Sequence, residues 1–259
     1  ISEGPSLMRV IVSTPLNSCA DTFKLADKNM ERYMTLPKVL IFDINETLLD
    51  MDEMKQGLAP VLNGDETLVD LWFATLLHHS LVDIASGQFH DFIDIGAAAL
   101  VMVAHSKDIE ISQSDAKQTI KKYITALPPH ADVKPALNAL KDKGFTLVAL
   151  SNSSINGLAE QLRFANIKDC FDHILSTETI HTYKPHASVY HWACNQVSAL
   201  PSEVMMVAAH GWDVSGAKAA GLQTTFIERP GKTMYPLGLT PDYVLSTLTE
   251  LANTLTSEC

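Results

Sequence analysis

The chain has 259 residues, and its 30 acidic and 19 basic residues give a formal net charge of -11 at pH 7. The hydrophobic share of 46% is typical of a globular protein, and a chain of this length can form a core without disulfides or metals. The acidic surplus argues against nucleic acids and anionic membranes as partners, and no apolar run reaches the roughly 18 residues of a membrane span.

The first 33 residues differ in character from the rest of the chain. They are polar, begin with Ile, and carry four bases and four acids, a balance that is not typical of an organellar transit peptide. We therefore predict that residues 1–33 are an N-terminal extension. The cysteines are far apart in sequence, at Cys19, Cys170, Cys194 and Cys259. This spacing favours reduced thiols in a cytoplasmic protein over a redox or zinc motif.

The first regular element is a short apolar run at residues 38–43, rich in β-branched residues and ending in Asp43. Such a run predicts a buried strand. Apolar residues then recur at spacings of three and four through residues 51–127, which predicts helices. Gly87 ends one of them, and a second covers residues 92–103. A pair of prolines closes this helical block.

Strands and helices alternate in the remainder of the chain. We predict helices at 136–143, 155–166, 188–197 and 214–220, and strands at 145–151, 173–176, 204–209 and 224–227. Repeated β–α units form parallel sheets that are covered by helices on both faces. The sequence therefore predicts an α/β fold with a Rossmann-like sheet, interrupted after its first strand by an inserted helical domain.

Polar residues follow several of the predicted strands. Asp43 follows the first strand, Ser151 and Asn152 follow the second, and residues 210–213 (His-Gly-Trp-Asp) follow a later one. Lys184 lies in a loop that precedes a helix. Ligands bind at the carboxyl ends of the strands in such sheets. Acids, a hydroxyl and a lysine that converge at this edge predict a catalytic site.

These residues belong to four motifs that resemble those of the haloacid dehalogenase superfamily. In chain order the motifs are Phe-Asp-Ile-Asn-Glu-Thr-Leu-Leu-Asp at 42–50, Leu-Ser-Asn at 150–152, Tyr-Lys-Pro at 183–185 and Ala-Ala-His-Gly-Trp-Asp at 208–213. The resemblance covers about residues 37–250, and the helical insert lies where that family has its cap. It implies an α/β core at 34–52 and 129–259 and a helical cap domain at 53–128.

Many members of the superfamily are magnesium-dependent phosphatases, and two positions depart from their pattern. Asn45 stands where phosphatases have a general acid, and Ala209 stands where they have a metal ligand. The sequence is more similar to the type II (S)-2-haloacid dehalogenases, which use no metal or other cofactor. A magnesium-dependent phosphatase of the same fold and a binding protein with a decayed site remain alternatives. The pair His78-His79 lacks the spacing of a metal site.

The resemblance implies hydrolysis of short (S)-2-haloalkanoic acids to (R)-2-hydroxy acids through an aspartyl ester. Asp43 would displace the halide from C2, and Lys184 would pair with Asp43 and with the developing charge. Thr47 and Asp213 would orient these groups and water, and Ser151 would donate to the substrate carboxylate. Further substrate-binding residues are predicted at Ile44, Asn45, Phe73, Leu77, Phe92, Asn152, Tyr190 and Trp212.

Within the dehalogenases this chain resembles a minority branch. Phe73 takes the place of a cap arginine proposed to receive the halide, and His210 and Glu46 both match that branch. Histidine is a base near neutral pH, and a carboxylate partner fixes its tautomer. We therefore hypothesise that His210 and Glu46 activate the hydrolytic water. The expected partners are a 2-haloacid and water, with a homodimer possible because relatives often dimerise.

Overall fold

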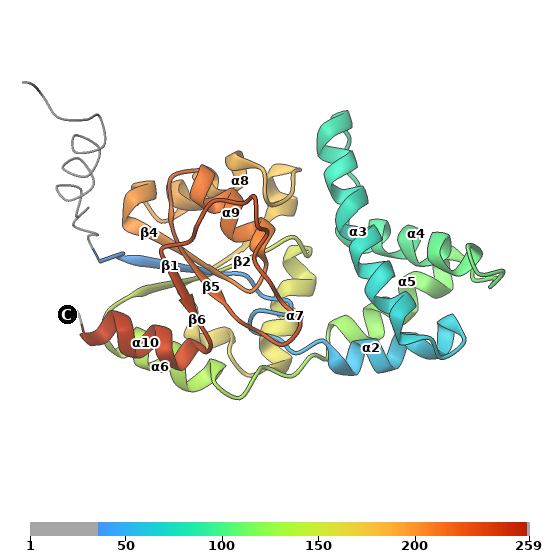
Figure 1. Cartoon of the computed structure of the whole chain (residues 1–259), viewed down its shortest axis with the longest axis horizontal. Helices are drawn as coiled ribbons and strands as arrows, with labels where there is room; N and C mark the ends of the chain where they lie inside the picture. The colour runs from blue at the N-terminus through green and yellow to red at the C-terminus, as the bar shows by residue number, and fades with distance from the viewer. Residues whose placement is uncertain (1–35, 258–259) are drawn as a thin grey trace, which may run out of the picture. The chain divides into compact units, whose positions relative to one another are not determined.

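The computed structural model describes residues 36–257, so the predicted extension at 1–33 lies outside the described residues. A six-stranded parallel sheet forms the centre of the described chain, with strand order β3-β2-β1-β4-β5-β6 (Figure 1). The strands are β1 (Val39–Phe42), β2 (Thr146–Ser151), β3 (His173–Ser176), β4 (Val204–Ala208), β5 (Gln223–Ile227) and β6 (Tyr243–Leu245). The predicted α/β class is confirmed.

Helices cover both faces of the sheet because its strands are apolar on both sides. In β1, Leu40 and Phe42 belong to one buried cluster, whereas Val39 and Ile41 belong to another. The first cluster includes residues of α6 (Val133–Asp142), α7 (Ile155–Phe164) and α10 (Leu248–Ser257), and the second includes residues of α8 (Ala187–Gln196) and α9 (Gly211–Ala219). Figure 1 shows α6 and α10 across the strands from α8 and α9.

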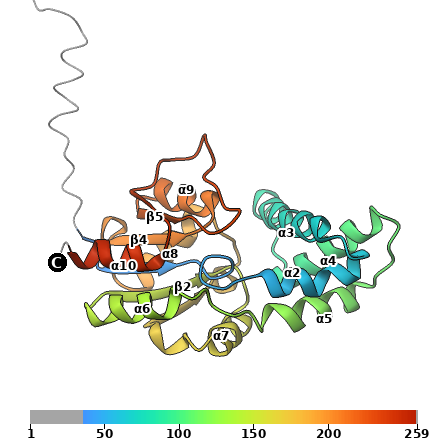
Figure 2. The same cartoon turned by 60° about the horizontal axis from the view of Figure 1, so that its bottom comes forward.

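The helical insert lies between β1 and α6 and contains α2 (Asp52–Leu58), α3 (Glu66–Ser86), α4 (Phe92–His105) and α5 (Gln113–Ile124) (Figure 2). Asp65 caps α3 by accepting a 2.9 Å hydrogen bond from the Thr67 amide, and Gly87 ends it with φ of 69°. The Trp72 indole donates to the Gly96 carbonyl at 2.8 Å, which joins α3 to α4.

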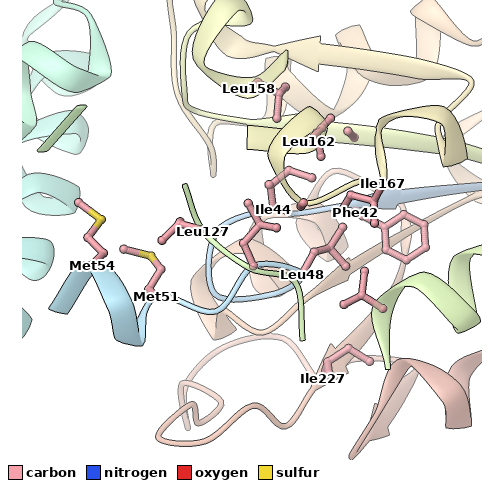
Figure 3. Packing of buried hydrophobic residues seen from close by; sticks show 14 of the residues in the cluster. Phe42, Ile44, Leu48, Met51, Met54, Leu127, Leu158, Leu162, Ile167 and Ile227 are labelled. Atoms are coloured by element: carbon pink, nitrogen blue, oxygen red, sulfur yellow. The ribbon is translucent and has the colours of Figure 1, made fainter. Parts of the chain in front are cut away.

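Two segments connect the insert to the sheet, and they are bonded to each other. Leu49 forms a β-bridge with Pro129, and the Asp50 amide donates to the Pro128 carbonyl at 2.8 Å. Apolar packing continues along this connection. Figure 3 shows the labelled side chains from Phe42 in the sheet through to Met54 in α2, and all belong to one buried cluster. The exact domain boundaries given above stay predictions.

One helix bears on the sequence expectation for membrane spans. α3 has 21 residues and is long and apolar enough to cross a membrane, by length and composition alone. The sequence expectation concerns uninterrupted apolar runs, and charged residues at Asp70 and Asp83 do interrupt the apolar residues of α3. The helix passes the length and composition test because that test tolerates two charged residues. Leu68, Trp72 and Leu76 are buried inside the insert, although only 28% of the apolar window of α3 is buried. One helix of this kind is weak evidence for a membrane span, because core helices and signal sequences pass the same test.

Candidate active site

The order of the strands places two chemical groups side by side. β1 and β4 are neighbours, yet the chain leaves them towards opposite sides of the sheet, and ligands bind at such a switch point. Asp43 directly follows β1, and its amide donates to the Val207 carbonyl of β4 at 3.0 Å. His210 follows β4 and precedes α9. The two side chains therefore meet at the carboxyl edge of the sheet.

A buried lysine bridges two buried carboxylates at this edge. Lys184 Nζ lies 2.7 Å from Asp43 Oδ1 and 2.6 Å from Asp213 Oδ2. The Tyr190 hydroxyl donates to Asp213 Oδ1 at 2.6 Å. The Lys184 side chain is 1% exposed, so water contributes little to balancing its charge. The ammonium is thus fixed between Asp43 and Asp213 by two charge-assisted hydrogen bonds.

The other oxygen of Asp43 receives two different donors. Thr47 Oγ1 donates to Asp43 Oδ2 at 2.7 Å, and His210 Nδ1 lies 3.0 Å from the same oxygen. Thr47 is itself held in place because its hydroxyl accepts from the Ala209 amide at 2.9 Å. All three side chains are at least nine-tenths buried. The Asp43 carboxylate is therefore held in one orientation by Lys184, Thr47 and His210.

Beyond His210 the ionic contacts continue to the edge of the domain. His210 Nε2 lies 2.8 Å from Glu46 Oε2, and Lys232 Nζ lies 2.6 Å from Glu46 Oε1. Asp213, Lys184, Asp43, His210, Glu46 and Lys232 form a row in which acids and bases alternate. Glu46 adopts φ of 64°, a conformation that costs energy for a residue other than glycine and is common at functional sites.

The contacts shift the pKa values of the row. Burial alone would raise the pKa of Asp43, but Lys184 and His210 outweigh it and hold that pKa far below its usual range. Burial would likewise raise the pKa of Glu46. The contacts with His210 and Lys232 outweigh burial, so the pKa of Glu46 is lowered. Burial favours a neutral imidazole, but the hydrogen bonds to Asp43 and Glu46 raise the pKa of His210 to about 9. In this arrangement His210 is therefore a cation at neutral pH.

This pKa shift predicts a pH-dependent contribution to stability. Because the folded-state pKa of His210 lies above its ordinary value of 6.5, its contribution is complete below pH 6.5 and is lost as pH rises through about 9. We expect the free energy of unfolding to fall across this window by roughly 3 kcal/mol at most. Urea denaturation at the two ends of the window measures it. A His210→Gln protein that kept the same fall would contradict the assignment.

A small pocket opens above the Asp43 carboxylate, with a volume of about 20 Å³. Most of the predicted site residues line it, namely Asp43, Asn45, Phe73, Leu77, Phe92, Ser151, Asn152, Lys184, His210 and Trp212. Thr47 and Asp213 do not line it but bond to Asp43 and Lys184, which do, and Tyr190 bonds in turn to Asp213. The structure does not bring the Ile44 side chain to the pocket, because it is fully buried in the core (Figure 3).

Ser151 and Asn152 have different surroundings. Ser151 Oγ accepts from the Ser153 amide at 3.1 Å, which leaves the hydroxyl proton free to be donated into the pocket. Asn152 Oδ1 accepts from the Lys184 amide at 3.0 Å and so fixes the backbone that carries the lysine. The predicted role of Asn152 as a donor thus rests on its amide nitrogen, while its oxygen positions Lys184.

Aromatic rings enclose the imidazole. The Trp212 ring stacks on His210 with centroids 5.2 Å apart and planes at 24°. The Phe73 ring of the cap lies 6.5 Å from His210, and Lys184 Nζ lies 5.8 Å from the Trp212 centroid. Aromatic walls exclude water, and a drier site strengthens the electrostatic interactions inside it.

Three residues near the site are absent from the sequence prediction. Lys232 lies in a loop without periodicity, and nothing in its sequence surroundings indicates a partner 2.6 Å away. Gln161 Nε2 donates to Asn45 Oδ1 at 2.8 Å from the apolar face of α7. Gly216 lies inside α9, where a Cβ atom would come within 2.4 Å of Pro185 Cβ. The glycine inside a predicted helix could have indicated, from the sequence alone, that another segment packs closely against this helix.

The two described cysteines and the pair His78-His79 lie outside the row of alternating acids and bases. Cys170 and Cys194 are buried free thiols, and burial raises the pKa of Cys194 to about 11. The thiolate form that a nucleophile needs is therefore disfavoured. His78 and His79 contact each other at 5.2 Å between ring centroids. Among residues 36–257, no group of three or more His, Cys, Asp or Glu side chains has a metal-binding arrangement.

Comparison with known proteins identifies the family of the chain. The family model of haloacid dehalogenase-like hydrolases matches residues 37–221. The (S)-2-haloacid dehalogenase 1 of Pseudomonas sp. (strain CBS-3) is 32% identical over 219 residues, which cover 84% of this chain and 96% of that enzyme.

Solved structures share the fold of this chain. The L-2-haloacid dehalogenase of Xanthobacter autotrophicus, with chloropropionic acid covalently bound, has a TM-score of 0.81 at 21% identity and covers 86% of this chain and 100% of that one. A dehalogenase with an intermediate complex has a TM-score of 0.77 at 25% identity, covering 84% and 96%. The chain therefore belongs to the haloacid dehalogenase-like hydrolases and, among them, to the 2-haloacid dehalogenase family.

Proposed function

We propose that this protein hydrolyses short (S)-2-haloalkanoic acids to (R)-2-hydroxy acids through an ester on Asp43. The observation that carries the proposal is the Asp43 carboxylate, which is ionised, buried and held by Lys184, Thr47 and His210 at the base of a small pocket. A carboxylate in such surroundings is a nucleophile with a fixed direction of attack. The names of the relatives support the same reaction.

In the first step an Asp43 oxygen attacks C2 of the substrate, and the halide leaves with the electron pair of the carbon–halogen bond. Oδ1 is the better candidate, because Lys184 is its only donor among the described residues, whereas Oδ2 has two. Attack from the side opposite the halide inverts C2. Ser151 and Lys184 supply hydrogen bonds and charge for the substrate carboxylate.

The second step needs a base, and ester formation creates it. Once Asp43 is esterified its negative charge is gone, so Glu46 alone supports the imidazolium and the pKa of His210 falls. His210 then releases the Nδ1 proton, while Nε2–H continues to donate to Glu46 Oε2. The neutral Nδ1 faces Asp43, where it can accept a proton from a water that attacks the ester carbonyl.

The protons and bonds of this cycle balance. Water adds to Cγ of Asp43, the Cγ–O bond to the substrate breaks, and the 2-hydroxy acid takes its hydroxyl proton from His210. The remaining proton of the water returns to His210 when Asp43 ionises again. Each turnover thus releases one halide and one proton. In this scheme Glu46 fixes the tautomer of His210 and is a positioning residue.

We also propose that the chain belongs to the branch in which Phe73 replaces the cap arginine. The cationic His210 beside Asp43 supplies positive charge at a pocket whose Phe73 wall is apolar.

Halide release from the two enantiomers of 2-chloropropionate, with and without a chelator, tests the proposed dehalogenation. We expect release from the (S) enantiomer in both conditions. Release from neither enantiomer would refute the proposed reaction.

The magnesium-dependent phosphatase finds less support. The position between Asp43 and Asp213, where a cation could bind two carboxylates, is taken by the Lys184 ammonium. The residue at the second ligand position, Ala209, offers no side-chain oxygen and donates its amide to Thr47. The residues around Asp43 therefore do not fit a magnesium ion, which prefers several oxygen ligands. A panel of phosphate esters with added magnesium is expected to give no turnover.

Lys232 is expected to be a positioning residue for Glu46. Replacement by Met removes the 2.6 Å contact and leaves Glu46 with His210 as its ionic partner, which should raise the pKa of Glu46. We expect kcat to fall several-fold and its acid limb to move to higher pH. The pH profile of kcat measures this shift. Lys232→Arg should restore the wild-type profile, and a profile unchanged in Lys232→Met would contradict the role.

A further inference from the structure

The catalytic pocket is too small for a substrate with a long substituent. Its volume of about 20 Å³ is little more than the roughly 15 Å³ that one ordered water needs. Two larger cavities adjoin it. One, of about 280 Å³, shares Asn45, Phe73 and Phe92 with the catalytic pocket. The other, of about 420 Å³, shares Phe73 with it. A group that extends beyond C2 can enter one of these two, because both share lining residues with the catalytic pocket.

The two cavities differ in chemistry. The first, called here the apolar cavity, lies between the cap helices and α7, and its inner wall is formed by Met54, Trp72, Leu76, Ile93 and Ile120. The second, called here the polar cleft, is lined by Glu46, Asp50, Asp52, Lys55, Asp70, His130, Arg229 and Lys232 together with apolar residues of the cap. The charged side chains that line the first cavity are Lys117, Lys121 and Glu160, whereas seven line the second. An apolar group would therefore desolvate fewer charged side chains in the first cavity than in the second.

We propose that the apolar cavity is a subsite for the C2 substituent of the substrate, so that the enzyme accepts 2-haloacids with an extended alkyl chain or an aromatic ring. This inference rests on the proposed dehalogenation. An apolar cavity of about 150 Å³ is enough to hold benzene, so a volume of 280 Å³ has room for a group of about six carbons.

The walls of the catalytic pocket give the substrate one consistent orientation. Ser151 and Lys184 of the core line the catalytic pocket and offer donors for a carboxylate, whereas Phe73 and Phe92 of the cap line both this pocket and the apolar cavity. Asn45 lies at the same boundary, where Gln161 Nε2 holds its Oδ1 at 2.8 Å. A substrate bound by its carboxylate at the core thus directs its C2 substituent past the two phenylalanines.

The apolar cavity reaches the surface near Lys121 and Glu160, which are both exposed. It could therefore serve every substrate as an entrance instead of holding a substituent. Two substrates with the same leaving group separate these roles. (S)-2-Bromopropionate carries a methyl group at C2, whereas (S)-2-bromohexanoate carries a butyl group. A subsite for substituents affects the second substrate selectively, whereas an entrance affects both.

The test is a substitution that places a larger side chain in the wall of the apolar cavity. Ile124 is half-buried at the end of α5, lines the apolar cavity and does not line the catalytic pocket. For the unsubstituted enzyme we expect kcat/KM for 2-bromohexanoate to equal or exceed that for 2-bromopropionate. In Ile124→Trp it should fall about tenfold for 2-bromohexanoate, because the methylene groups lose their apolar contacts, and stay within about twofold for 2-bromopropionate.

Two further variants complete the experiment. Ile111→Trp makes the same change at a half-buried residue of the cap outside the cavity and should leave both substrates unaffected. Ile93→Phe fills the cavity from α4 and should repeat the selective loss. Equal losses for both substrates in the filling variants, or rejection of 2-bromohexanoate by the unsubstituted enzyme, would overturn the subsite. Failure to release bromide from either substrate would overturn the proposed reaction itself.

Discussion

Replacing His210 by Ala is expected to stop the reaction halfway, with the ester left on Asp43. Alkylation needs the Asp43 carboxylate and Lys184, whose 2.7 Å contact does not involve the imidazole. Hydrolysis needs a base next to the ester carbonyl, and His210 Nδ1 lies 3.0 Å from Asp43 Oδ2. Loss of a general base slows a step by about 10²–10⁴-fold. The first turnover should therefore release one halide per enzyme, and later turnovers should nearly cease.

Intact-protein mass spectrometry measures the trapped ester directly. After incubation with (S)-2-chloropropionate, the His210→Ala protein should carry the mass of one propionate group, located by proteolysis on the peptide that contains Asp43. Glu46→Gln provides a milder comparison, because it keeps the imidazole but weakens its 2.8 Å contact at Nε2. We expect partial accumulation in that variant. Lost turnover without any adduct in His210→Ala would exclude the assigned role.

Replacing Asp43 by Asn is expected to abolish halide release, by at least about 10⁴-fold, because an amide does not attack C2. The same change imitates the charge of the esterified enzyme. With Asp43 neutral, His210 keeps Glu46 as its acidic partner, so its pKa should fall from about 9 towards the ordinary value of 6.5. The substitution therefore tests both the nucleophile and the proposed change of His210 from acid to base.

Titration of the His210 ring by NMR distinguishes the two effects. Asp43→Asn should lower the pKa of His210, whereas Asp213→Asn should leave it nearly unchanged, because Asp213 contacts Lys184 and Tyr190 and not the imidazole. An unchanged His210 pKa in Asp43→Asn would mean that ester formation does not create the base. Halide release that persisted in Asp43→Asn would remove Asp43 as the nucleophile.

The strands that carry the site were predictable because they are buried on both faces. Continuous apolar runs predict β1 and β4, and each predicted end lies within one residue of the observed end. The polar residues that follow these runs are easily recognised in the sequence. β6 (Tyr243–Leu245) and α10 escaped prediction. β6 is a three-residue edge strand with an exposed Val244, and its apolar run of Tyr, Val and Leu is too short to indicate a strand.

The contacts within the site were less predictable than its members. Glu46 and His210 are 164 positions apart, and their 2.8 Å contact follows from the neighbouring positions of β1 and β4. Lys232 reaches Glu46 from a loop that packs closely on Gly211, where a Cβ atom would lie 2.8 Å from the Tyr235 amide nitrogen. Such packing leaves no periodic signal. Ile44 shows the opposite case, since its place in the motif does not indicate that its side chain turns into the core.

The bonded pair of segments that joins the cap to the sheet has a consequence for how activity is lost on heating. β1 and β4 each pair with a strand on both sides, so their amides should exchange with solvent only through global unfolding. The cap is tied to them through the Leu49–Pro129 bridge and the methionines beside it. Opening at this tether would uncover Asp43 and admit bulk water while the sheet stays intact. Thermal inactivation below the main unfolding transition would then be reversible on cooling.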